Sequence, residues 1–176
     1  MKRQIRQHVF ETNSSSLHTL VISNKDMGRC HLHIKKDGYV HVNLVNYYGR
    51  DETDYTTQYE KLVYIVTWMY IYCGCDMEVL VDSYMWKDFI DKFCDYVNDD
   101  LHRTPKGLEE PKCLGVKIDK TINNGDFGGG AYDYLDHQSA PYGKYDDSNC
   151  VVSLYRTNEV MNFIFNKNLW LHTDSD

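Results

Sequence analysis

The sequence predicts an α+β fold, a mixed or antiparallel sheet with two main helices packed on it. Short apolar stretches that are typical of strands occur near both ends of the chain, at residues 16–23 and 169–173. Two longer patterns with the spacing of helices lie between them, at residues 57–72 and 83–97. Strands and helices in this mixed order favour a sheet that helices cover.

Length, composition and charge limit the possible functions. We expect one domain over residues 1–176, because a chain of this length is usual for a single domain. Hydrophobic residues make up 42% of the chain, which is enough for a globular core. The formal net charge is −7. Binding along a duplex backbone needs cations that neutralise phosphates, so the charge argues against it. A local basic patch or a basic protein partner remains compatible with the charge.

Two strands are expected around a polar connection near the N-terminus. Residues 1–10 alternate loosely between apolar and polar and predict a first strand. Residues 16–23 are apolar enough to predict a partly buried second strand. Residues 11–16 then form a tight connection. Asn and Ser side chains often bond to nearby backbone groups, so a self-capped turn is the structural alternative to a functional role here.

Residues 29–45 predict a β-hairpin. A two-residue turn would mix its faces, so we predict a three-residue loop, Lys36-Asp37-Gly38, with Gly38 in the left-handed region. This register turns six apolar side chains inward: Cys30, Leu32, Ile34, Val40, Val42 and Leu44. It turns three histidines outward: His31, His33 and His41. Three such imidazoles can hold zinc. Because the sequence offers them no obvious carboxylate partner, we favour a solvated polar face.

The first helix follows a polar stretch, residues 46–55, that predicts a loop. Thr57 and Glu60 have the spacing of a capping box, which predicts the helix start. Residues 62–72 are apolar nearly all round, so we expect a central, buried helix that Gly74 ends. A bilayer-spanning helix needs about 20 residues, so no membrane segment is expected.

The second helix should begin at Asp82 or Ser83, either of which can cap it. Its apolar residues follow the i, i+3, i+4, i+7 pattern and predict a core stripe: Trp86, Phe89, Ile90, Phe93 and Val97. Its wet face should carry Lys87, Asp88, Asp91, Lys92 and Asp95.

The last third of the chain is less regular. Two of the three prolines lie in residues 102–112, which predict a surface crossing before a short strand at 114–118. Residues 121–149 are rich in Gly, Tyr and Asp and predict a loop insertion. Long stretches of this kind in a compact domain are usually functional or disordered.

Three further elements are expected after this loop. Residues 150–155 predict a strand, residues 157–166 a short helix and residues 169–173 a closing strand. We expect the closing strand to share one sheet with residues 16–23, and the helix at residues 62–72 to pack on that sheet.

The six cysteines stand at positions 30, 73, 75, 94, 113 and 150. The N-terminus turns polar at once and has no apolar segment of the secretory kind, so we expect a cytoplasmic location, in a bacterial host cell, and reduced thiols. Cys73-Gly74-Cys75 does not have the Cys-x-x-Cys spacing and has no second pair, which favours packing cysteines. We expect no metal and no other cofactor.

The densest polar stretch is residues 8–18, His-Val-Phe-Glu-Thr-Asn-Ser-Ser-Ser-Leu-His. Its motif Phe-Glu-Thr-Asn-Ser-Ser-Ser-x-His resembles the opening of a family of small uncharacterised proteins from phages and mobile elements of Gram-positive bacteria. Residues 134–139 and 162–166 resemble the same family. The resemblance implies an accessory role against host defence, such as that of an anti-CRISPR protein, and implies no particular activity.

The hypothetical site pairs two imidazoles, those of His18 and His137. Because imidazole titrates near neutrality, such a pair can serve as general base and general acid in metal-independent cleavage of a phosphodiester. Asp136 or Glu11 can fix the tautomer of one ring. Polar and basic groups would hold the phosphate oxygens: Arg6, Asn13, Ser14, Ser15, Ser16 and Ser139. The sequence thus predicts a ribonuclease or phosphodiesterase cleft, partly covered by residues 121–149.

Other interpretations stay open. A small acidic protein can block a host defence nuclease by occupying its nucleic-acid channel, without any catalysis. A protein with the same pocket can also sequester a nucleotide without cleaving it. A serine hydrolase is a further enzymatic interpretation, although no Gly-x-Ser-x-Gly motif surrounds the serines. The expected partners are therefore RNA, a nucleotide or a host defence nuclease, and not a membrane.

Overall fold

The computed structural model describes residues 3–5, 17–22, 32–44, 53–101, 111–121 and 150–174. They form the predicted α+β fold. The larger sheet has the strand order β1 (Arg3–Ile5), β2 (Leu17–Ile22), β6 (Leu169–Asp174) and β4 (Thr53–Tyr55). A smaller sheet pairs β3 (Tyr39–Asn43) with β5 (Gly115–Lys120). The helices are α1 (Gln58–Tyr72), α2 (Met77–Asp82), α3 (Tyr84–Leu101) and α4 (Thr157–Phe165).

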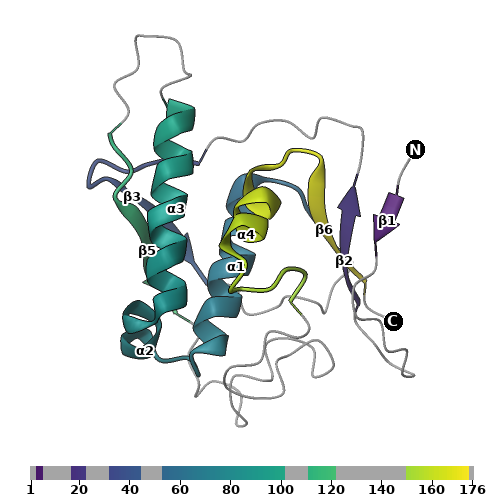
Figure 1. The fold of residues 1–176 in the computed structure, drawn as a ribbon, viewed down its shortest axis with the longest axis horizontal. Helices are drawn as coiled ribbons and strands as arrows, with labels where there is room; N and C mark the ends of the chain where they lie inside the picture. Colours follow the sequence, from purple (N-terminus) through teal and green to yellow (C-terminus); the bar gives the residue numbers. More distant parts are fainter. Residues whose placement is uncertain are drawn as a thin grey trace.

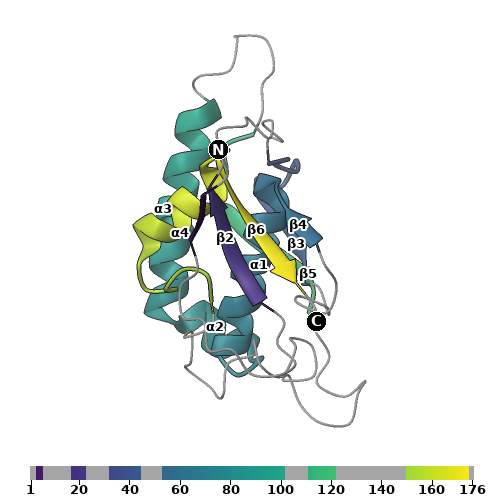
Figure 2. The ribbon, with the colours of Figure 1, turned by 90° about the vertical axis from the view of Figure 1, so that its right-hand side faces the viewer.

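The helices α1 and α4 lie between the larger sheet and α3, which contacts β5 of the smaller sheet. In Figure 1 the larger sheet stands to the right of α1 and α4, and the β3–β5 pair stands to the left, beside α3. Figure 2 looks onto the larger sheet and shows β2 and β6 in front of α1. Buried side chains from α1, α3, α4, β3 and β5 belong to one hydrophobic cluster, which Leu171 of β6 joins. None of the described helices is long and apolar enough to cross a bilayer.

The prediction that residues 16–23 and 169–173 share one sheet is confirmed. β2 and β6 pair antiparallel from Leu17 opposite Asp174 to Ile22 opposite Leu169, and β1 extends β2 on its other edge. Leu20 and its opposite neighbour Leu171 pack against the helical core. Val21 and its opposite neighbour Trp170 are also buried. Because successive side chains of a strand point to opposite faces, both faces of the sheet are covered at this point.

β4 corrects the prediction of a loop over residues 46–55. Its residues Thr53–Tyr55 pair antiparallel with β6. A strand of three polar and aromatic residues has too little alternation to reveal itself, and it exists because β6 offers it a ladder of hydrogen bonds.

The hairpin register is confirmed where the structure describes it. Ile34 and Val40 form an antiparallel bridge, and Gly38 has a φ of 85°. The inward residues are buried as predicted: Leu32, Ile34, Val40, Val42 and Leu44. His33 is exposed. Cys30 and His31 lie outside the described residues. The ladder of β3 is made with β5, in parallel, which the sequence did not indicate.

The start of α1 is the predicted capping box. The Glu60 backbone N–H donates to Thr57 Oγ1 at 3.1 Å, and the Thr57 N–H donates to Glu60 Oε2 at 2.9 Å. Every residue from Lys61 to Tyr72 is buried, as expected for a central helix. Gly74 follows the helix with a φ of 73°, a conformation that glycine adopts at little cost.

Lys61 was not anticipated in this buried row. It is only 1% exposed, and its Nζ donates to the carbonyl oxygens of Asn166 and Leu169, both at 3.0 Å. The ammonium also lies 5.7 Å from the centroid of the Phe163 ring. Asn166 caps the C-terminal end of α4, so Lys61 ties α1 to the turn between α4 and β6. Burial lowers the pKa of Lys61 to about 8.

The second predicted helix is α3, and Ser83 caps it by accepting a hydrogen bond from the Trp86 N–H at 3.1 Å. Its stripe is confirmed as core, because Trp86, Phe89, Phe93 and Val97 are buried and Ile90 packs against them. The short helix α2 precedes it and was not predicted. Its N-cap is Asp76, whose Oδ1 accepts from the N–H groups of Glu78 and Val79.

The prediction of a strand at residues 150–155 is wrong. These residues form bends and a turn, with the Arg156 N–H bonded to the Ser153 carbonyl at 3.0 Å. Val151, Val152 and Leu154 are buried in the core, so the apolar pattern reflects burial without a neighbouring strand. The strand at 114–118, the helix at 157–166 and the closing strand correspond to β5, α4 and β6.

Candidate functional site

Most of the predicted site lies outside the described residues. Of the residues proposed for chemistry or binding, the structure describes only the backbone of His18, which lies in β2 opposite Thr173 of β6. The others fall outside the described ranges: Arg6, Glu11, Asn13, Ser14, Ser15, Ser16, Asp136, His137 and Ser139. Their convergence with His18 on one cleft therefore stays a prediction.

The described residues contain a histidine–carboxylate pair in the larger sheet. His172 of β6 lies directly opposite Asp54 of β4, and its Nδ1 is 2.8 Å from Asp54 Oδ1. The imidazole is 24% exposed and the carboxylate 51% exposed, so a solute can reach both. In the tautomer that carries its proton on Nδ1, His172 donates a hydrogen bond to Asp54, and the lone pair of Nε2 is left for proton transfer. This is the arrangement of an oriented general base.

Thr19 lies on the other side of His172 from Asp54. The register places Thr19 of β2 directly opposite His172, so the row Thr19, His172, Asp54 crosses three strands. Side chains that are directly opposite in neighbouring strands share a face of the sheet. Thr19 is fully buried, and its hydroxyl has no hydrogen-bond partner among the residues that the structure describes. A buried hydroxyl of this kind can steady a neighbouring ring or a bound group, but it is too enclosed to be a nucleophile.

The His172–Asp54 pair lies near the end of the larger sheet at which β2 begins. β2 begins at Leu17, directly after Ser16, and Leu17 pairs with Asp174. Thr19 is only two residues further along β2, and it faces His172. Sequence reasoning missed this pair because Asp54 and His172 are 118 positions apart and Asp54 was expected in a loop. Only the pairing of β4 with β6 could have revealed it.

A second histidine lies between two carboxylates on the β3–β5 sheet. His41 Nδ1 is 2.8 Å from both carboxylate oxygens of Asp119, and its Nε2 is 2.9 Å from Asp37 Oδ2. Lys35 and Lys117 lie 3.5 Å and 3.6 Å from Asp119 and Asp37. The hydrogen bond from His41 lowers the pKa of each carboxyl group below the ordinary value of 3.8.

This cluster is structural in character. Both ring nitrogens of His41 contact carboxylate oxygens, so neither faces a metal or a substrate. The cluster instead ties the hairpin loop, through Asp37, to β5, through Asp119. It also corrects the expectation that this face lacks carboxylate partners. No group of His, Cys, Asp or Glu among the described residues is arranged to hold a metal ion.

Burial raises the pKa of three cysteine thiols in the described part of the chain, those of Cys75, Cys94 and Cys113. The five cysteines of the described ranges, at positions 73, 75, 94, 113 and 150, are buried or half-buried. Burial raises the pKa of Cys75 to about 11 and that of Cys94 to about 12. Because the thiolate is the form that reacts and binds metals, these residues are poor nucleophiles and fit the packing interpretation.

Comparisons with known proteins identify no family and no function for the chain. No protein-family model, no curated protein and no solved structure matches the chain. The likeness of the motif at residues 10–18 to a phage family therefore stays a prediction, and the function is argued from the geometry of the described residues.

Proposed function

We propose that the chain is a metal-independent hydrolase that cleaves a phosphodiester in RNA or a nucleotide, with His172 as its general base. The observation that carries the proposal is the 2.8 Å contact between His172 Nδ1 and Asp54 Oδ1, on adjacent strands. An imidazole held by a carboxylate through one nitrogen offers the other for proton transfer near neutral pH. The biological setting we propose is that of a phage accessory protein acting against host defence, as the N-terminal motif suggests.

The chemistry needs two proton transfers. Nε2 of His172 takes the proton of a ribose 2′-hydroxyl, whose oxygen attacks the adjacent phosphorus. The 5′-oxygen leaves with a proton from a general acid, and the product ends in a 2′,3′-cyclic phosphate. We propose His137 as that acid, since the β2 residue that faces His172 is Thr19 and His18 lies opposite Thr173. Arg6, Asn13 and the serines at positions 14–16 are proposed to hold the phosphate.

The test is an RNA cleavage assay in the presence of EDTA, with product ends identified by mass spectrometry. We expect a 2′,3′-cyclic phosphate from a single-stranded RNA and no cleavage of a strand with a 2′-deoxyribose at the scissile position. His172→Ala should lower the rate about 100-fold or more, which is the usual range for a lost general base. Asp54→Asn should lower it as well, by leaving the wrong tautomer.

His33→Ala is the matched control, because His33 is exposed and lies outside the larger sheet, in the segment before β3. Circular dichroism of each variant separates loss of chemistry from loss of fold. Cleavage that survives His172→Ala in a folded protein would refute the assignment of the base.

The binding interpretations predict different results. A sequestering protein would bind the RNA or nucleotide without changing its mass. A nuclease blocker would neither bind nor cleave the RNA or nucleotide, and it would still inhibit its target nuclease after His172→Ala. The net charge of −7 is the observation that keeps the blocker as the second candidate.

A further inference from the structure

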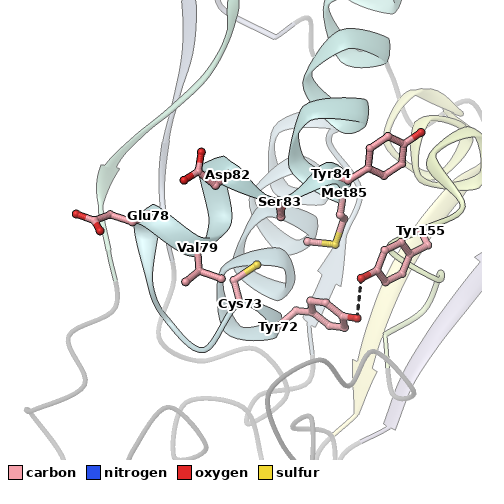
Figure 3. Close-up of a pocket in the computed structure, with 9 residues that line it drawn as sticks. All are labelled: Tyr72, Cys73, Glu78, Val79, Asp82, Ser83, Tyr84, Met85 and Tyr155. Carbon is pink, nitrogen blue, oxygen red and sulfur yellow. Dashed lines mark hydrogen bonds between the residues drawn. The ribbon is translucent and has the colours of Figure 1, made fainter.

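A pocket outside the larger sheet has no role in the proposed reaction. Its volume is about 520 Å³, within the range of roughly 300–1,000 Å³ that is common for binding pockets. It lies where the end of α1, the helix α2 and the start of α3 meet the segment before α4 (Figure 3). Nine residues line it: Tyr72, Cys73, Glu78, Val79, Asp82, Ser83, Tyr84, Met85 and Tyr155.

The floor of the pocket is apolar and fixed. Tyr72, Cys73 and Met85 are 7%, 1% and 3% exposed, so they belong to the packed interior. Figure 3 shows the side chains of Cys73 and Met85 pointing toward the centre of the cavity. Val79 adds an apolar wall from α2. A long side chain entering here would contact sulfur and aliphatic carbon, which adapt well to flexible chains.

Two tyrosines form an exposed aromatic rim. Tyr155 is 56% exposed and Tyr84 is 77% exposed, which is unusual for rings of this size. Tyr155 is nevertheless held in place, because the Tyr72 hydroxyl donates to its oxygen at 2.9 Å and the two rings meet edge to face at 5.7 Å. An exposed but ordered aromatic ring binds a partner at little cost in side-chain entropy.

The charges around the rim are negative. Glu78 and Asp82 extend outward from α2 at the edge of the pocket, and both are exposed (Figure 3). Two described cations adjoin the lining residues. Lys87 Nζ lies 3.7 Å from Asp82 Oδ1 and donates to the Asp82 carbonyl at 2.8 Å, and Arg156, which follows Tyr155, pairs with Glu159 at 3.1 Å. Aromatic faces attract cations, and carboxylates do so as well. A phosphate or another anion would meet repulsion from both carboxylates.

We propose that this pocket docks an arginine side chain from a basic segment of a partner protein. The aliphatic part of the arginine lies over Val79 and Met85, and the guanidinium stacks on Tyr155 and Tyr84. Glu78 and Asp82, on the opposite side of the pocket in Figure 3, add a negative potential that attracts the basic segment. Arginine fits better than lysine because its planar group stacks on aromatic rings and is more weakly hydrated. The site is built from other elements than the Asp54–His172 pair, so it does not depend on the proposed hydrolysis.

The probe is the peptide acetyl-Gly-Arg-Arg-Gly-amide, and the readout is the NMR shift of the Met85 methyl group and of the Tyr rings in the full chain. The matched peptide replaces both arginines by citrulline, which has the same shape without the charge. We expect saturable shifts with the arginine peptide and at least about fivefold weaker binding of the citrulline peptide, the size of a partly exposed cation–π contact. Equal binding of the two peptides, or no shift with either, would overturn the proposal.

Three variants locate the site. Tyr84→Ala should weaken the binding of the arginine peptide about fivefold. The ring is exposed enough that the fold should tolerate its loss. Tyr59→Ala is the control, because Tyr59 is an exposed tyrosine of α1 that does not line the pocket. Lys87→Ala should strengthen binding about twofold, because it leaves the Asp82 carboxylate without its cation.

Each variant result decides the proposal. A role of Tyr84 in folding alone would not produce the opposite effect of Lys87→Ala, so both changes must be seen. Unchanged binding to the Tyr84→Ala variant would place the peptide elsewhere and refute the site. Stronger binding of adenosine monophosphate than of the arginine peptide, with the same resonances shifting, would show that the pocket takes a nucleotide, contrary to the proposal.

Discussion

We expect the free energy of unfolding of the native protein to rise with pH in alkaline solution, and Lys61→Met should remove this rise. Lys61 is 1% exposed, and burial lowers its pKa from 10.5 to about 8. Between these two values the unfolded chain holds the proton that the native chain has lost, so the free energy of unfolding increases with pH. The neutral amine still has two N–H donors for the carbonyls of Asn166 and Leu169, so deprotonation breaks neither hydrogen bond.

The size of this effect follows from the two pKa values. From about pH 7 to about pH 9.5 the native protein should gain about 2 kcal/mol relative to the Lys61→Met variant, since one unit of pKa shift corresponds to about 1.4 kcal/mol. The comparison cancels the cost of the two carbonyls that methionine leaves unpaired, because that cost is the same at both pH values. The comparison also cancels the contributions of tyrosines and cysteines to the pH dependence, because these residues titrate in both proteins.

Urea unfolding followed by tryptophan fluorescence at the two pH values measures this difference. Lys112→Met is the control, because Lys112 is exposed and its removal should leave the pH dependence unchanged. If the native protein and Lys61→Met gain or lose stability in parallel as the pH rises, then Lys61 keeps its proton in the folded state and the reasoning fails.

Three further predictions concern local structure and stability. Thr57→Ala should lower the free energy of unfolding by about 1 kcal/mol, because it removes the hydroxyl that accepts from the Glu60 N–H, and Thr57→Ser should restore most of the loss. Gly38→Ala should destabilise by about 1–2 kcal/mol in the same urea assay, because φ is +85° and an added Cβ would lie 2.8 Å from Leu114 Cδ1; an unchanged midpoint would contradict the loop geometry. The depressed pKa of Asp37 and Asp119 means that the native chain binds fewer protons than the unfolded chain around pH 4, so stability is lost as the pH falls below the ordinary carboxyl value of 3.8. His41→Ala should flatten that acid loss, and an equally steep loss in the variant would show that other carboxylates cause it.

Local signals in the sequence predicted those elements whose stability is itself local. The capping box of Thr57 and Glu60 and the apolar stripe of α3 depend on residues three or four positions apart, so their patterns are visible in the sequence. The hairpin register followed from the loop that Gly38 permits. The strand pairing of β2 with β6 was predicted because the segments that resemble one family lie near the two ends of the chain.

Elements that depend on distant partners were missed. Thr53–Tyr55 is a strand only because β6 lies beside it, and residues 150–155 look like a strand because they are buried. Asp54 and His172 were overlooked for the same reason, since neither is unusual within its own segment. Of the two carboxylate partners of His41, Asp37 is only four residues away in the hairpin loop, whereas Asp119 reaches His41 only when β5 pairs with β3. The sequence thus indicated candidate side chains and not which of them meet.

The position of β6 has a consequence for synthesis on the ribosome. β6 lies between β2 and β4 in the sheet, yet it is the last of the described strands to be translated. Until it emerges, β1 and β2 form at most a two-stranded unit, which is marginally stable by itself, and β4 has no neighbour. A nascent chain that stalls before residue 169 therefore exposes unpaired strand edges, which invite pairing with other chains. Such a product should aggregate or be degraded, whereas truncation of an edge strand would leave the remaining sheet intact.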